Sequence, residues 1–74
     1  MSNHVFELRH EHIALCDLLK AVAIAPSGGI AKMMIAAGDV QVNGQVDTRK
    51  TAKIRAGMVV SVMGETIEVI AAAV

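Results

Sequence analysis

The first half of the chain spaces its hydrophobic residues as a helix does. Positions i, i+3, i+4 and i+7 are filled by Leu15, Leu18, Leu19 and Val22. This spacing predicts a helix over about 14–23 with those side chains turned inward. Pro26 prevents the helix from continuing, and Ser27 is a good N-cap for a second helix. The second helix should end at Gly38, and its buried face is predicted to consist of Ile30, Met33, Met34 and Ala37.

The second half of the chain alternates hydrophobic and polar residues, as strands do. The segment VQVNGQV, residues 40–46, has period two around Asn43-Gly44, which is the strongest hairpin signal in the chain. Strands are also predicted over 58–63 and 66–70, with Gly64-Glu65 as the tight turn between them. These segments predict a run of short strands joined by tight turns.

The two ends of the chain carry weaker patterns. His4–Leu8 alternates and predicts a short edge strand, whereas residues 71–74 are expected to fray. The order is therefore strand, two helices and several strands. We expect a single α+β domain over residues 1–74, with a core at about 5–70, in which two packed helices lie against a small, mostly antiparallel sheet.

Composition narrows the classes of function. Hydrophobic residues make up 54% of the chain, yet Phe6 is the only aromatic residue. A platform that stacks several bases of single-stranded nucleic acid needs several aromatic rings, so the sequence excludes one. Cys16 is the only cysteine, and no segment has the pattern of a signal peptide or a membrane span. We therefore expect a cytoplasmic protein that does not enter a membrane.

The charges are unevenly distributed although the chain is neutral overall. Residues 27–55 contain five Lys or Arg against two Asp, a net charge of +3, whereas the flanking segments are both negative. A neutral protein that collects its cations in one segment is expected to present a basic face to an anion. The cations of this segment are Lys32, Arg49, Lys50, Lys53 and Arg55.

The second helix has an unusual start, Ser27-Gly28-Gly29. Glycine weakens a helix by about 1 kcal/mol relative to alanine. The first turn also lacks an acid that would complement the helix dipole. Bare amides at an uncompensated helix N-terminus suit a phosphate, and Lys32 would lie one turn above the glycines. The alternative is that the glycines only relieve crowding against the first helix and that Lys32 is an ordinary solvated lysine.

Residues 48–55 form the second candidate site for an anion and are named here the basic loop. It contains four of the cations together with the hydroxyls of Thr48 and Thr51, and Asn43 precedes it at the hairpin tip. If the segment is partly extended, Arg49, Lys53 and Arg55 share one side. Such groups suit phosphate oxygens. A solvated loop, and an Asn-Gly pair that only serves the turn, remain the alternative.

These segments resemble the S-four-type RNA-binding domain, named for the fourth protein of the small ribosomal subunit. The resemblance covers about residues 5–69 and rests on LLK at the end of the first helix, then SGGIAKMMI, GDVQVNG and TRKTAKIRAG in that order. The ordered set is specific, although each piece alone is weak. The match is nearest to the small stand-alone bacterial members, the YbcJ-like proteins.

The resemblance implies the alpha-L fold and RNA binding through the second helix and the basic loop. Together with the reasoning on the helix start and the loop, it points to Ser27, Gly28, Gly29, Lys32, Asn43, Arg49, Lys50, Lys53 and Arg55 as RNA-binding residues. Many relatives have a basic residue where this chain has Gly28, and the missing charge weakens the expected binding. Many relatives also have an acid where this chain has Met58, and that position looks structural.

The sequence favours a non-enzymatic protein that binds structured RNA, ribosomal or transfer RNA, without a preference for DNA. We expect no catalytic residue, no cofactor and no metal. His10, His12 and Cys16 fall short of the four ligands of a structural zinc site. The rival interpretation is a protein-interaction module that docks on a ribosomal or RNA-processing partner, with RNA contact incidental. Its basis is the neutral net charge and the high apolar content.

Overall fold

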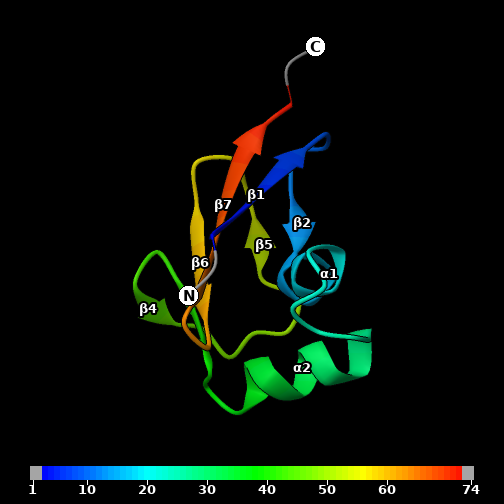
Figure 1. Ribbon diagram of the computed structural model, residues 1–74, viewed down its shortest axis with the longest axis vertical. Coiled ribbons are helices and arrows are strands. Elements are labelled where there is room, and N and C mark those ends of the chain that lie inside the picture. Colours follow the sequence, from blue (N-terminus) through cyan, green and yellow to red (C-terminus); the bar gives the residue numbers. More distant parts are fainter. Residues whose placement is uncertain (1–2, 73–74) are drawn as a thin grey trace.

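The computed structural model describes residues 3–72 and contains one main sheet with two helices at one end of it (Figure 1). The strand order is β1-β7-β6-β3-β4. The bounds are β1 Asn3–Leu8, β7 Glu65–Ala71, β6 Val59–Val62, β3 Val40–Val42 and β4 Gln45–Val46. Neighbouring strands are antiparallel except for β1 and β7, which run parallel. The edge position expected of the first strand is confirmed.

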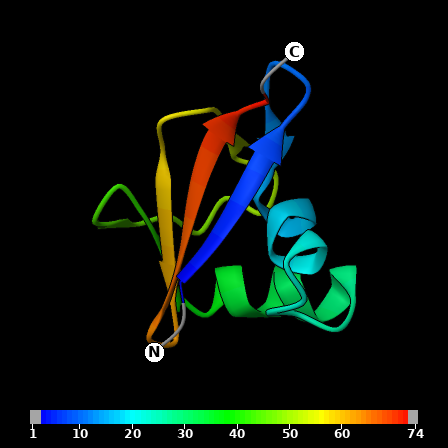
Figure 2. The ribbon, with the colours of Figure 1, turned by 45° about the horizontal axis from the view of Figure 1, so that its top comes forward.

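The helices are α1, Leu15–Ala21, and α2, Gly28–Ala36, and they pack on each other. A second, two-stranded sheet pairs β2, Ile13–Ala14, with β5, Lys53–Ile54. Figure 2 shows the helices together on one side of the main sheet. The α+β architecture of two packed helices and a mostly antiparallel sheet is therefore confirmed.

The core lies between the helices and one face of the main sheet. Its side chains are aliphatic, because alternate positions of the strands and one stripe of α1 face inward. The largest of the fully buried side chains are Leu15, Leu18, Leu19, Ile35, Ile54, Ile67, Val40, Val60, Val62 and Val69. The leucines whose spacing predicts the first helix are thus buried as expected, and Val22 packs against them partly buried.

The buried face of α2 differs from the prediction. Ala31 and Ile35 are fully buried, whereas Ile30 is 41% exposed and Met33 is 67% exposed. Met34 alone of the four predicted side chains packs against the core. The sequence GGIAKMMIA is apolar almost all round, so its spacing does not single out one face. The small side chain of Ala31 suits a close approach of α2 to its neighbours.

Two details of the strands are also corrected. The turn between β6 and β7 is Met63-Gly64 and not Gly64-Glu65, because Val62 pairs with Glu65. Met63 and Gly64 have φ of 51° and 79°, as in the mirror-image turns that match the twist of a hairpin. At the C-terminus, Ala71 belongs to β7 and the Ala72 N–H donates to the Leu8 carbonyl at 3.1 Å. Fraying is thus wrong for these two residues, and 73–74 lie outside the described part.

The basic loop is anchored more firmly than predicted. Ala52 and Ile54 are buried, and Lys53–Ile54 forms strand β5 where a loop was expected. The carbonyls of Ala52 and Lys50 accept from the amides of Leu15 and Cys16 at 2.9 and 3.0 Å. These amides open α1, whose N-cap residue provides no side-chain hydrogen bond. The loop backbone therefore caps the first helix and is fixed by it.

Candidate nucleic-acid interface

The start of α2 forms the first part of the candidate interface, named here the helix-start patch: Ser27, Gly28, Gly29 and Lys32. The Ser27 hydroxyl caps the helix by accepting from the Ile30 N–H at 3.3 Å. Because the hydroxyl oxygen accepts this bond, its proton remains able to donate. The amides of Gly28 and Gly29 open the helix and have no partner inside it.

Neither side-chain packing nor backbone conformation requires glycine at positions 28 and 29. A Cβ on Gly28 would meet nothing within 4 Å, and one on Gly29 would meet only the Ser27 hydroxyl oxygen at 3.9 Å. Neither glycine has a positive φ. Crowding against α1 is thus excluded as the explanation for the two glycines.

Lys32 follows one turn later on α2 and is exposed. It takes part in none of the ion pairs found among residues 3–72. Its charge is therefore available to an anion near the helix start. The first turn contains no acid that would compete for that anion.

Asn43 and Gly44 form the tip of the hairpin between β3 and β4, with φ of 51° and 84°. The Asn43 side-chain carbonyl accepts from the Val59 N–H at 2.9 Å. That bond fixes the side chain and leaves its NH2 group as two unused donors. Asn43 thus has both the turn role and a free donor group.

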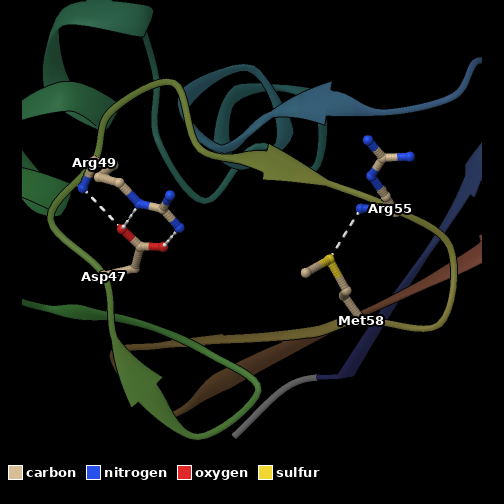
Figure 3. A network of polar contacts seen from close by, with 4 residues as sticks. All are labelled: Asp47, Arg49, Arg55 and Met58. Carbon is tan, nitrogen blue, oxygen red and sulfur yellow. Dashed lines mark hydrogen bonds and ion pairs between the residues drawn. The ribbon is translucent and has the colours of Figure 1, made fainter.

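Arg49 is tied to Asp47. Its Nε and one terminal nitrogen donate to the two carboxylate oxygens at 3.0 and 2.8 Å, and its backbone N–H donates to the same carboxylate at 2.9 Å (Figure 3). The side-chain hydrogen bonds from Arg49 hold the pKa of Asp47 below its ordinary value and raise that of Arg49. Arg49 is 77% exposed but carries its own counter-ion, whereas the Asp47 side chain is 13% exposed.

The other three cations of the basic loop are freer. Lys50 and Lys53 are exposed and join none of the ion pairs among residues 3–72. Arg55 lies 3.8 Å from Glu11 across two exposed side chains, which is a weak pairing. Because Ala52 and Ile54 point inward, Lys53 and Arg55 lie on the same outer side of the strand.

The structure brings some of the predicted residues together and separates others. Asn43 and Arg49 line one groove, and Arg49 and Lys53 line an adjoining hollow. The start of α2 lies at the end of the helix away from the β3–β4 hairpin (Figures 1 and 2). The helix-start patch and the hairpin tip with Asn43 are therefore separate parts of the surface.

The sequence does not indicate the part played by Asp47, and it indicates only a structural position for Met58, which packs partly buried against the core. Asp47 was counted only as a negative charge, although Asp-Thr-Arg is a pattern in which an Asp side chain bonds the backbone two residues on. Met58 accepts from the Arg55 N–H at 3.1 Å through its sulfur and lines the same groove as Arg49. No pattern in the sequence indicates that contact.

Other chemistry has little support in the described part. Among residues 3–72, no three His, Cys, Asp or Glu side chains gather as metal ligands would. Cys16 is buried in α1. Within the same residues, no helix combines the length and the apolar character needed to cross a membrane.

Comparison with known proteins gives consistent results. "Putative RNA-binding protein YbcJ" of Escherichia coli (strain K12) is 49% identical over 63 residues, which cover 85% of this chain and 90% of the relative. The YbcJ protein of Shigella flexneri matches to the same extent. The solution structure of YbcJ from E. coli, described as revealing an alfaL motif involved in RNA-binding, matches 90% of this chain and 86% of its own at 48% identity, with a TM-score of 0.72. The model of the S4 domain matches residues 6–70, and the chain therefore belongs to the S4 domain family.

Proposed function

We propose that this protein is a non-catalytic module that binds structured RNA through the helix-start patch and the basic loop. The observation that carries the proposal is the pair of glycines at the start of α2, where a Cβ would meet no packing neighbour closer than 3.9 Å. Two glycines weaken the helix start by about 1 kcal/mol each, and neither folding nor packing requires them. A ligand that must approach the backbone closely would require residues without side chains at these two positions.

A phosphate group fits this helix end. Its oxygens accept from the amides of Gly28 and Gly29, and the positive end of the helix dipole favours its charge. The Ser27 hydroxyl adds a donor beside these amides. Lys32, one turn above, adds a full positive charge. The helix-start patch therefore provides neutral donors and a cation around one position.

The basic loop adds charge along the backbone of the same RNA. Lys50 and Lys53 have no counter-ion among the described residues, and Arg55 has only a distant one. Together with Lys32 they make about four phosphate contacts, so log affinity should fall with log salt at a slope near −3. Contacts of this kind position RNA without reading its sequence. An interface of this size should bind in the micromolar range.

We infer the class of RNA from the rigidity of the two parts. The first turn of α2 is capped by Ser27, and the basic loop is held by backbone bonds to Leu15 and Cys16, so their donors and charges keep fixed positions. A rigid surface of this kind fits a folded RNA better than a flexible strand. We propose ribosomal or transfer RNA in the cytoplasm, and the RNA-binding motif of the E. coli relative supports RNA as the ligand.

The test is binding to a structured ribosomal RNA fragment across a salt series, with duplex DNA of equal length as the control. We expect preferential RNA binding with a slope near −3. Lys53→Glu should weaken the affinity by roughly tenfold or more while leaving the fold intact, because Lys53 is exposed. Lys20→Glu, on the exposed side of α1, is the matched control and should bind as the wild type does. Equal binding by the Lys53 variant would exclude the basic loop.

A second candidate function is docking on a ribosomal or RNA-processing protein, with RNA contact incidental. The observation in its favour is the exposure of Ile30 and Met33 on α2, beside Lys32. An apolar docking surface is nearly insensitive to salt. Absence of RNA binding at low salt would therefore favour this candidate over the first.

A further inference from the structure

A groove open to solvent lies between the β3–β4 hairpin and the loop that follows it. Its apolar lining comes from the hairpin and from the residue before β6, and its polar lining comes from the hairpin tip and the loop. The residues that matter here are Val42, Val46 and Met58 on the apolar side and Asn43, Thr48 and Arg49 on the polar side. The groove therefore has an apolar side together with hydrogen-bonding groups.

Arg49 presents a flat cation that is held in place at this groove. Two parallel hydrogen bonds to the Asp47 carboxylate, at 3.0 and 2.8 Å, fix one edge of the guanidinium. The two faces of the plane are not used by these bonds. The Asp47 carboxylate is itself held by the Arg49 backbone N–H at 2.9 Å. The loop therefore fixes both the position and the plane of the guanidinium.

Met58 lies on the other side of the groove and is also held. Its sulfur accepts from the Arg55 N–H at 3.1 Å, which restrains the long side chain. Figure 3 shows the ends of Arg49 and Met58 both pointing into the space between the loop and the strands. A flat ligand that enters the groove from solvent and lies over one face of the guanidinium would have the polarisable thioether of Met58 in the same groove.

We propose that this groove receives one unpaired nucleobase of the RNA, which stacks on the Arg49 guanidinium and contacts Met58. This inference rests on the proposed function and adds a base-specific contact to an interface that otherwise binds phosphates. Unpaired bases of folded RNA stack on Arg planes as well as on aromatic rings. Phe6, the only aromatic residue in the chain, belongs to β1 and does not line this groove.

The ion pair with Asp47 favours a base over a phosphate at this position. A phosphate would have to share Arg49 with a carboxylate that already occupies two of its donors. A neutral base meets no such repulsion and needs only the face of the plane. The free NH2 group of Asn43, which the bond to the Val59 N–H turns away from β6, adds donors for the base edge.

Three RNA hairpins of the same length test the proposal with the intact protein: one fully paired, one with a single bulged nucleotide, and one with an abasic nucleotide at the bulge. The abasic hairpin keeps the bent backbone but lacks the base. We expect the bulged hairpin to bind about tenfold more tightly than the abasic one, as base stacking contacts do. Equal binding of the bulged and abasic hairpins would overturn the inference and leave the proposed function standing. Failure of all three to bind would overturn both.

Two variants separate stacking from charge. Arg49→Lys keeps the charge but loses the plane, so the ratio between bulged and abasic hairpins should fall from about tenfold to about twofold. Asp47→Asn releases Arg49, so it should strengthen binding to the abasic hairpin at low salt while lowering the same ratio. An unchanged ratio in both variants would overturn the inference even if the wild type prefers the bulge.

Discussion

The helix-start patch and the basic loop prepare for an anionic ligand in opposite ways. Among residues 3–72, the one side-chain hydrogen bond found at the helix start is that from the Ile30 N–H to the Ser27 hydroxyl, and a Cβ on Gly28 would meet nothing within 4 Å. In the basic loop, backbone bonds to Leu15 and Cys16, the burial of Ile54 and the bidentate pair with Asp47 hold Lys50, Ala52, Ile54 and Arg49 in place. The helix-start patch therefore leaves its backbone donors uncovered by side chains, whereas the basic loop holds its cations on a fixed backbone.

The difference shows that a count of cations is a poor guide to where an anion binds. Arg49 is one of the four cations of the loop in the sequence, yet its charge is balanced by Asp47. Gly28 and Gly29 have no side chain and carry no charge, yet they provide the free donors of the helix start. Burial and hydrogen bonding decide which charges remain available.

The largest expected effect is a loss of stability when the buried anchor of the basic loop, Ile54, is truncated. Ile54→Ala removes a side chain that is 1% exposed and should lower the free energy of unfolding by about 3 kcal/mol. Met33→Ala is the matched control, because Met33 is 67% exposed and its loss should cost less than about 0.5 kcal/mol. Urea unfolding measures both. If the two variants cost the same, the loop is not anchored through Ile54.

The next largest effect is expected at Gly28, where one substitution should change stability and RNA affinity in opposite directions. Gly28→Glu adds a better helix former and an acid at the positive end of α2, so stability should rise by about 1 kcal/mol. The carboxylate occupies the position proposed for a phosphate, so the RNA affinity should fall by roughly tenfold. Thermal unfolding and RNA titration give the two values.

Gly28→Ala is the control for this variant. It should share the gain in stability, because a Cβ at Gly28 meets nothing within 4 Å, and it should lose less affinity. A Gly28→Glu variant that is more stable and binds RNA at full strength would contradict the phosphate site.

A smaller effect is expected when the unpaired charge of Lys32 is compared with the paired charge of Arg49. Lys32→Ala should make the salt slope of RNA binding shallower by about 0.8, the contribution of one phosphate contact. The double variant Asp47→Ala/Arg49→Ala leaves the net charge unchanged, so its slope on a fully paired RNA hairpin should match the wild type. A shallower slope in the double variant would mean that Arg49 contacts a phosphate despite Asp47.

The smallest effect concerns pH. The Arg49 hydrogen bonds lower the pKa of Asp47 in the folded state. The pair therefore contributes stability above the ordinary Asp pKa, and this contribution is lost as the pH falls through the lowered value. The difference in unfolding free energy between the wild type and Asp47→Asn should accordingly be present at pH 6 and shrink by pH 3. A difference that grows on acidification would contradict the pair.

Much of the fold could be predicted because its patterns are local. The leucines of α1 and the Asn-Gly hairpin each follow from a few neighbouring residues. The buried face of α2 could not be predicted, because Ile30, Met33 and Ile35 are equally apolar and only packing selects among them. Strands β2 and β5 have two residues each, too few for a period to appear.

The candidate site was predictable in its residue types but not in its arrangement. The glycines and Lys32 indicate an anion site from their spacing alone. The balance of Arg49 by Asp47 and the place of the basic loop beside the start of α1 depend on the path of the loop. That path is set by backbone bonds to Leu15 and Cys16, which no local pattern contains.

These backbone bonds also restrict how the protein can change during evolution. The carbonyls of Lys50 and Ala52 must both reach the first turn of α1, at 3.0 and 2.9 Å. A substitution at position 50 keeps its carbonyl in place, but an insertion or deletion between 50 and 52 would move at least one contact out of reach. Related proteins should therefore vary in the side chains of this segment and keep its length constant.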